Sequence, residues 1–218
     1  MSVEKLSPVL QEQFAFSAAL SDWFQKNLAE SFELDEDHRR QRLVMAFLNI
    51  ALEHREALLA LVALNARSAA MALTRSILDA FVRGMWFQLA ATPEQIESFY
   101  AKRYDPTMKG MLKGLKDSGW PHTDGLQRQF STLSDYAHGS VLQVARWLAS
   151  ADVAPRHRDE ELVEILGLAD LSCILAAWQR QLSCKADHSS YGAKAGEVAS
   201  RVQKLRQAAL AARAVDDL

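Results

Sequence analysis

Three charged residues at four-residue spacing mark one segment of the chain as a candidate for chemistry. Arg75, Asp79 and Arg83 are the only charges between residues 68 and 91, where the rest of the sequence is almost entirely apolar. On a helix of 3.6 residues per turn this spacing places them in one stripe, with Trp86 beside it. Buried charges are costly unless they are paired, so we expect the stripe either to organise the core or to serve a binding or catalytic role.

His54 is the expected partner of this stripe. If the chain turns at residues 65–67, the helices before and after the turn are antiparallel, and His54 lies at the height of Asp79. A carboxylate there would satisfy one ring nitrogen and fix the tautomer. We favour a structural network in which Arg75 and Arg83 bracket this pair, and the alternative is a binding site for an anion or phosphate.

A second group of polar residues follows on a predicted short helix further along the chain. Ser131, Ser134, Asp135 and His138 share one edge of this helix, and His138 stands three residues after Asp135 at the helix end, where the helix dipole favours a protonated imidazole. Tyr136, Gln143 and Arg146 are close by in the sequence. His138 is either an ordinary helix-end residue or a general acid or base. A Ser-His-Asp triad is excluded, because side chains on one short helix do not converge.

The segment between residues 102 and 128 is locally basic. Lys109, Lys113 and Lys116 recur there at helical spacing. Because acidic residues dilute these charges, we favour a solvated lysine face, and the alternative is a contact with phosphates.

No metal or cofactor is expected. No two histidines stand four residues apart, and Cys173 and Cys184 lack the spacing of metal ligands. On one helix these cysteines would be about 16 Å apart, so we expect free thiols. The sequence also lacks a glycine-rich phosphate loop that follows a strand.

The composition favours one folded domain with a large core. The chain has 218 residues, of which 49% are hydrophobic and 24% charged, and its net charge is −2. This balance gives the whole molecule no field that would attract nucleic acid or anionic lipid. The first residues, MSVEKLSPVL, do not resemble a targeting segment, so we expect a cytoplasmic protein. No uncharged stretch approaches the ~20 residues that a membrane span requires.

The positions of the prolines and the apolar periodicity predict an all-α fold. All five prolines stand where a helix can begin or has ended, and no strand pattern appears. Long helices are expected over residues 8–30, 35–64, 68–91, 159–184 and 193–212. Short helices are expected after Pro93, with Thr92 as the capping residue, and after Pro106, with Asp105 as the capping residue, and also over about residues 126–137 and 141–149. The predicted core face of the second helix includes Ile50, His54 and Leu58. We expect an antiparallel bundle of about five long helices with two or three short ones.

The tryptophans suggest a further interpretation. Trp86, Trp120, Trp147 and Trp178 are many for a bundle of this size, and although most should lie in the core, some could line the interface of a homodimer.

The third predicted helix resembles a family of uncharacterised bacterial helical proteins, a domain of unknown function. The resemblance rests on Arg75, Asp79 and the run Arg83-Gly-Met-Trp86, with the His138-Gly element downstream. It extends over about residues 42–147. The family pattern has Glu where this chain has Asp79, and the resemblance implies a helical fold but no activity.

A weaker similarity is to the HEPN class of small helical proteins, many of which are metal-independent ribonucleases of toxin and defence systems. That similarity implies RNA as a substrate and an Arg and a His as catalytic residues. If such a site is assembled in space, Arg75 or Arg83 would stabilise the phosphate, and His138 or His54 would move the proton. The favoured function is a binding or regulatory protein whose polar network holds a small anionic ligand, and the ribonuclease is the alternative.

Overall fold

Eight α-helices make up the described part of the chain. The structure, a computed structural model, describes residues 6–28, 38–121, 123–137, 144 and 157–216, and these ranges contain no β-strand. The helices are α1 (Pro8–Asn27), α2 (Arg39–Ala63), α3 (Arg67–Leu89), α4 (Pro93–Tyr100), α5 (Met108–Asp117), α6 (Thr123–Ala137), α8 (Asp159–Ser183) and α9 (Tyr191–Asp216). Five of them have 20 residues or more, which confirms the predicted all-α bundle.

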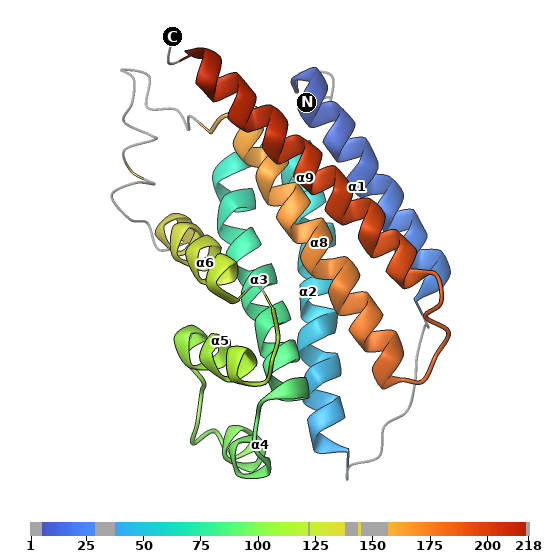
Figure 1. Ribbon diagram of the computed structural model, residues 1–218, viewed down its shortest axis with the longest axis vertical. Helices are drawn as coiled ribbons and strands as arrows, with labels where there is room; N and C mark the ends of the chain where they lie inside the picture. Colours follow the sequence, from blue (N-terminus) through green and yellow to red (C-terminus); the bar gives the residue numbers. More distant parts are fainter. Residues whose placement is uncertain (1–5, 29–37, 122, 138–143, 145–156, 217–218) are drawn as a thin grey trace.

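The long helices lie side by side and α3 stands between two groups of neighbours (Figure 1). On one side α3 packs against α2 and α8, which in turn contact α1 and α9. On the other side it carries α5 and α6, and the short α4 follows its end. The helices α1, α3 and α8 run in one direction, and α2 and α9 run in the opposite direction (Figure 1). Of the helix predicted for residues 141–149, only residue 144 is among the described residues.

No helix within the described ranges has the length and apolar character to cross a membrane.

Capping residues in the sequence mark where α1 and α4 begin. The side chain of Ser7 caps α1, and at α4 the side chains and backbone amides of Thr92 and Gln95 bond reciprocally. The start of α5 differs from the prediction. Thr107, and not Asp105, is its capping residue, because Pro106 stands before the cap and not at the first helical position.

The helices α2 and α3 form a hairpin with a close approach near its open end. Asn65, in the turn, has a φ of 55°, a left-handed conformation that asparagine adopts more readily than most residues. Further along α3, Gly84 lies against α2. A Cβ at Gly84 would lie only 2.6 Å from Cδ2 of Leu48, which is fully buried. The glycine therefore lets the two helices come together at this point.

A buried ion pair joins α2 to α8 in the core. The side chains of Arg55 and Asp170 are each only 1% exposed, and Nη2 of the arginine lies 2.7 Å from Oδ1 of the aspartate. Two side chains of α1 donate hydrogen bonds to Oδ2 of Asp170: Ser17 Oγ at 2.6 Å and Gln13 Nε2 at 3.1 Å. Arg55 also donates to Ser21 Oγ and to the Ser17 carbonyl. One cluster of polar atoms thus connects three helices.

The ion pair corrects the predicted core face of α2. We expected His54 and Ile50 to face the interior, but Ile50 is 38% exposed and His54 is half-buried. Arg55 points inward instead, and Leu58 is buried as predicted. The core face is rotated from the predicted one because Asp170, from a distant part of the chain, supplies a partner for a buried arginine.

The first turns of α1, α3 and α8 meet at Asp159. Its carboxylate accepts a hydrogen bond from the backbone N–H of Ser7 at 2.7 Å and forms an ion pair with Arg67 at 2.6 Å. Burial alone would raise the pKa of Asp159, but the hydrogen bonds from Ser7 and Arg67 outweigh burial and hold the pKa below its usual value. One carboxylate therefore ties three helix beginnings together.

Removing one partner of the buried pair should be costly. Burial raises the pKa of Asp170, and the attraction of Arg55 and the hydrogen bond from Ser17 offset that rise only in part. Asp170→Ala removes the buried counter-charge and leaves the guanidinium only the half-exposed carboxylate of Glu56, 2.8 Å from Nη1, so we expect the free energy of unfolding to fall by about 3–5 kcal/mol. The double variant Arg55→Met, Asp170→Leu removes both charges and should be clearly more stable than Asp170→Ala. Denaturant unfolding measures both, and a double variant as unstable as the single one would contradict this account.

The hydrogen bond and the ion pair of Asp159 make the stability of the fold depend on pH. Because the pKa is lower in the folded state, the unfolded chain takes up this proton first as the pH falls, and the stabilisation disappears below the unfolded pKa of about 4. The stability difference between wild type and Asp159→Asn should be present at neutral pH and shrink as the pH falls through that value. Denaturant unfolding over this pH range measures it. Asp117→Asn, at an exposed position on α5, is the control and should show no such trend.

Candidate functional site

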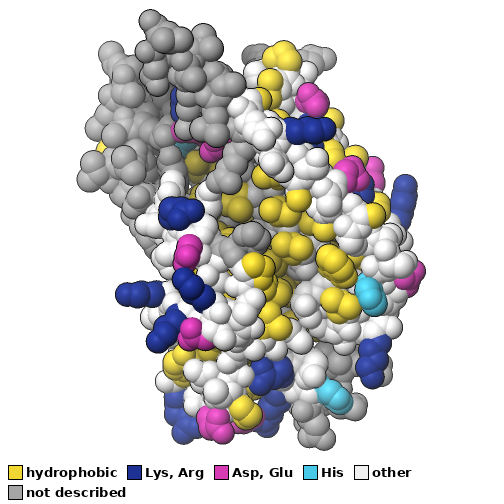
Figure 2. Space-filling view, in the orientation of Figure 1, with side chains coloured by type: hydrophobic (Ala, Val, Ile, Leu, Met, Phe, Trp, Pro, Cys, Tyr) yellow, Lys and Arg dark blue, Asp and Glu magenta, His cyan; other side chains and the backbone are white. Residues whose placement is uncertain are grey.

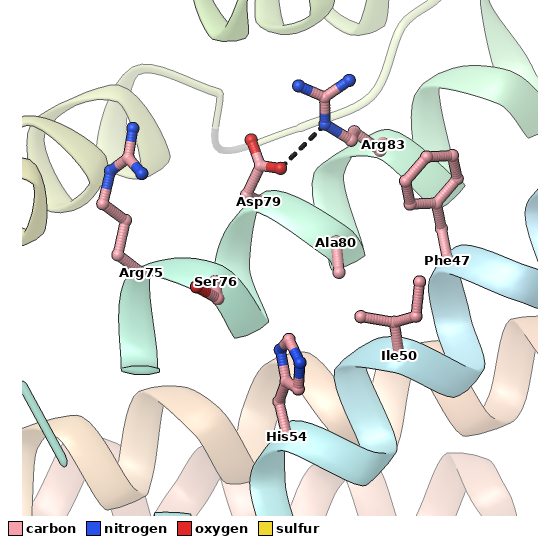
Figure 3. A pocket seen from close by; sticks show the side chains of 8 residues that line it. All are labelled: Phe47, Ile50, His54, Arg75, Ser76, Asp79, Ala80 and Arg83. Atoms are coloured by element: carbon pink, nitrogen blue, oxygen red, sulfur yellow. Dashed lines mark hydrogen bonds and ion pairs between the residues drawn. The ribbon is translucent and has the colours of Figure 1, made fainter. Parts of the chain in front are cut away.

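A pocket between α2 and α3 brings together four residues singled out in the sequence. It has a volume of about 270 Å³ (Figure 3). The four are His54 from α2 and Arg75, Asp79 and Arg83 from α3. The remaining lining residues carry no charge, and they are Phe47, Ile50, Ser76 and Ala80.

Arg83 is held by two carboxylates. Its Nε donates to Oδ2 of Asp79 at 2.7 Å, and its Nη1 donates to Oδ1 of Asp105 at 2.6 Å, from the segment between α4 and α5. Burial alone would lower the pKa of Arg83, but the hydrogen bonds to Asp79 and Asp105 raise the pKa overall. The guanidinium also lies over the ring of Phe47, 5.9 Å from its centroid. Arg83 is therefore a charged residue whose partners belong to the protein.

Arg75 has a different environment. Its Nε donates to Ser134 Oγ on α6 at 3.0 Å, and its guanidinium lies 4.7 Å from the ring centroid of Phe130, also on α6. Within the described ranges it forms no ion pair with Asp79 or with another carboxylate. The expectation that both arginines bracket a shared Asp79 is therefore wrong for Arg75.

His54 faces the pocket without the expected hydrogen bond to Asp79. The carboxylate of Asp79 turns toward Arg83 and away from the ring (Figure 3). Among the described atoms, Nδ1 of His54 is buried and has no hydrogen-bond partner. The ring thus keeps a hydrogen-bonding capacity that these parts of the protein do not use.

The stripe lies at the edge of the core and not inside it. The side chains of Asp79 and Arg83 are 30% and 16% exposed, against 1% for the Arg55–Asp170 pair. A partly exposed ion pair contributes little to stability. The architectural role that we expected of the stripe belongs to Arg55 and Asp170, and the stripe forms the wall of a pocket.

The two polar groups predicted from the sequence meet at the bond between Arg75 and Ser134. Asp135 and Tyr136 follow Ser134 in the last turn of α6, where the structure describes the backbone alone. The other members of the second group, His138, Gln143 and Arg146, lie outside the described residues.

The glycine and the tryptophan of the Arg-Gly-x-Trp run do not line the pocket. Trp86 is 3% exposed, and its ring lies 6.3 Å from that of Tyr104. A Cβ at Gly114 of α5 would lie 2.9 Å from Nε1 of Trp86. Gly84 allows the contact with α2 and Trp86 holds α5 and the preceding segment, so this part of the motif is structural.

Sequence reasoning missed two side chains that reach the stripe from elsewhere in the chain, Asp105 from the segment between α4 and α5 and Ser134 from α6. Asp105 was interpreted only as a helix start, and Ser134 only as part of a separate group. Their contacts with Arg83 and Arg75 span 22 and 59 residues. Helical periodicity carries no signal for contacts of this kind, although the phenyl ring of Phe47 could have been found as part of the apolar stripe of α2.

The geometry supplies cations and no metal centre in the described part of the chain. No group of three or more His, Cys, Asp or Glu residues there is placed to hold a metal ion. The two thiols also stay apart: Cys173 is buried, Cys184 is half-buried, and both are free. The chemistry of the pocket is therefore that of guanidinium, imidazole and hydroxyl groups beside an apolar wall.

Comparison with known proteins finds a family of unknown function whose model matches most of the part of the chain that forms the pocket. The model of that family, DUF6988, matches residues 48–183, which include every charged residue of the pocket and the buried pair Arg55–Asp170. No curated protein and no solved structure gave a match. The family match confirms the resemblance seen in the third helix.

Proposed function

The chain belongs to this family of unknown function, which brings no activity with it, and from the pocket we propose that the protein binds a small anionic ligand. The observation that carries the proposal is Arg75. In the described ranges it is the one charged group of the pocket that lacks a partner of opposite charge, because both carboxylates near the stripe bond to Arg83.

Arg75 is organised for binding before a ligand arrives. Ser134 accepts a hydrogen bond from Nε, and the ring of Phe130 lies against one face of the guanidinium. The N–H groups of Nη1 and Nη2 therefore remain available to donate to a ligand. A guanidinium in a fixed orientation can donate two parallel hydrogen bonds to a carboxylate or a phosphate. A side chain that is already ordered loses less conformational entropy on binding.

The charge balance favours a monoanion over a dianion. Arg83 is matched by Asp79 and Asp105, so these three groups together carry one negative charge, and Arg75 restores neutrality. A second negative charge on a ligand would meet those carboxylates without a further cation. A carboxylate group therefore suits the pocket better than a doubly charged phosphate.

The remaining wall selects for a short apolar part on the ligand. Phe47, Ile50 and Ala80 offer apolar surface, while Ser76 and His54 can hydrogen-bond to a polar substituent. The volume of about 270 Å³ lies just below the roughly 300–1,000 Å³ of pockets for drug-sized ligands. The ligand class is therefore a small carboxylate with an aromatic ring or a short aliphatic chain.

Binding of benzoate tests this proposal. We expect benzoate to shift the NMR signals of residues around the pocket, and neutral benzamide of the same shape and inorganic phosphate to do so much less. Arg75→Met should weaken benzoate binding at least about tenfold, because a hydrogen bond to a charged group is worth about 1.5–3 kcal/mol. Arg128→Met, at an exposed position on α6, is the matched control and should bind as wild type does. Equal binding of benzoate and benzamide, or an unaffected Arg75→Met variant, would argue against the proposal.

A metal-independent ribonuclease, the activity implied by the HEPN similarity, is the second candidate function. The observation in its favour is the hydrogen bond from Arg75 to Ser134, because α6 ends at Ala137 and His138 follows directly in the sequence. In such a reaction the arginine would stabilise the charged phosphate and the histidine would transfer the proton.

Cleavage of RNA in the presence of a chelator tests the ribonuclease. If this function is correct, wild type degrades single-stranded RNA with the metal removed, and His138→Ala loses at least about a hundredfold of that rate. Arg128→Met serves again as the control. Intact RNA after long incubation with wild type would exclude the ribonuclease and leave the ligand-binding proposal untouched.

A further inference from the structure

The strongest concentration of positive charge lies apart from the pocket, on α4, α5 and the segment between them. Residues 100–116 contain five lysines or arginines and one acid, in a chain whose net charge is −2. Figure 2 shows lysine and arginine side chains gathered over this side of the molecule, with fewer acids among them. We call Lys102, Arg103, Lys109 and Lys113 the basic surface.

The cations of the basic surface are not neutralised by the described part of the protein. All four are exposed, and none forms an ion pair there. Three of the nearby carboxylates are engaged elsewhere: Asp105 with Arg83, Glu97 with Arg39, and Asp124 with Lys116. Asp117, one turn after Lys113 on α5, forms no ion pair in the described part of the chain and is one acid against these four cations. The basic surface therefore keeps its positive charge available for an external anion.

Two exposed tyrosines lie within the same surface. Tyr100 is 41% exposed and Tyr104 is 36% exposed, and they flank Lys102 and Arg103 in the sequence. Exposed aromatic rings among cations provide stacking platforms for unpaired bases, while the cations bind the phosphates between them. This combination is typical of surfaces that bind single strands without sequence preference.

The buried ring of Trp86 holds these parts next to each other. It packs against Tyr104 on one side and against α5 at Gly114 on the other, one residue from Lys113. Asp105, which follows Tyr104, is fixed by its bond to Arg83. Trp86 thus positions both Tyr104 and α5, which carries the lysines. These parts of the backbone therefore need little rearrangement when a strand binds.

We propose that the basic surface, with Tyr100 and Tyr104, binds single-stranded nucleic acid. The apolar side of α5, formed by Met111, Leu112 and Leu115, is buried in the core and has no freedom to enter a lipid bilayer. An anionic membrane therefore matches the charge, but the surface offers no free apolar helix face that could insert into the membrane. This inference concerns a different face of the molecule from the pocket and does not depend on ligand binding there.

Fluorescence anisotropy with a labelled oligodeoxythymidylate of about 12 nucleotides tests the proposal. This probe has no 2′-hydroxyl, so binding is measured apart from any cleavage of RNA. If four cations contact phosphates, the logarithm of the affinity should fall with the logarithm of the salt concentration with a slope of about −3. In Lys109→Ala, Lys113→Ala the slope should be about half as steep, and binding at low salt should weaken at least about tenfold.

The matched control removes two charges from the opposite side of the molecule. Lys26→Ala, Lys204→Ala changes two exposed lysines on α1 and α9 and alters the net charge equally, and it should bind as wild type does. At the tyrosine, Tyr104→Ala should weaken binding at least about fivefold, whereas Tyr104→Phe keeps the ring and should retain it. Thermal unfolding of each variant checks that the fold is kept.

Three results would overturn the inference. They are the absence of oligonucleotide binding at low salt, equal losses in the two double lysine variants, and a stronger attachment to vesicles of phosphatidylcholine and phosphatidylserine than to the oligonucleotide. The last result would make a membrane surface, and not a nucleic acid, the partner of the basic surface.

Discussion

The packing of the bundle depends on the buried pair of Arg55 and Asp170. Every nitrogen of the arginine has an acceptor, and the carboxylate takes further hydrogen bonds from α1, so the cost of burying two charges is met by a complete set of partners. Such a cluster tolerates one relative placement of α1, α2 and α8. Apolar side chains alone would allow these long helices to slide, because hydrophobic contact has no preferred direction.

The orientation of α2 that Arg55 imposes has a consequence on the opposite face. When Arg55 points into the core, the neighbouring His54 turns toward α3 and the molecular surface, where it meets the charged stripe. The stripe can then lie at the edge of the core, partly exposed, with a pocket in front of it. The buried pair Arg55–Asp170 and the charged stripe therefore lie on different sides of α2, and only the stripe is accessible to a ligand.

The proposed ligand pocket and the basic surface are separate sites on a common support. Arg83 lines the pocket and bonds to Asp105, and the adjoining Tyr104 packs on Trp86, one turn of α3 from Arg83. The Arg-Gly-x-Trp run thus places the pocket wall, the close contact with α2 and the support for α5 within four residues. Each of Arg83, Gly84 and Trp86 therefore has a structural reason for its type.

The sequence by itself determined the helical class, the approximate extents of the long helices and the caps at Ser7 and Thr92, because proline, capping residues and apolar periodicity act within a few positions along the chain. It also identified the stripe and His54 as neighbours, since a short turn between two helices leaves few arrangements. Only the tertiary structure decided which residue of α2 faces the core, because His54 and Arg55 are adjacent in the sequence and the choice rests on Asp170, 115 residues away. The same holds for Asp105 and Ser134, which reach the stripe from 22 and 59 residues away in the sequence. It also holds for the difference between the two arginines, of which, among the described residues, Arg83 is paired with carboxylates and Arg75 is not.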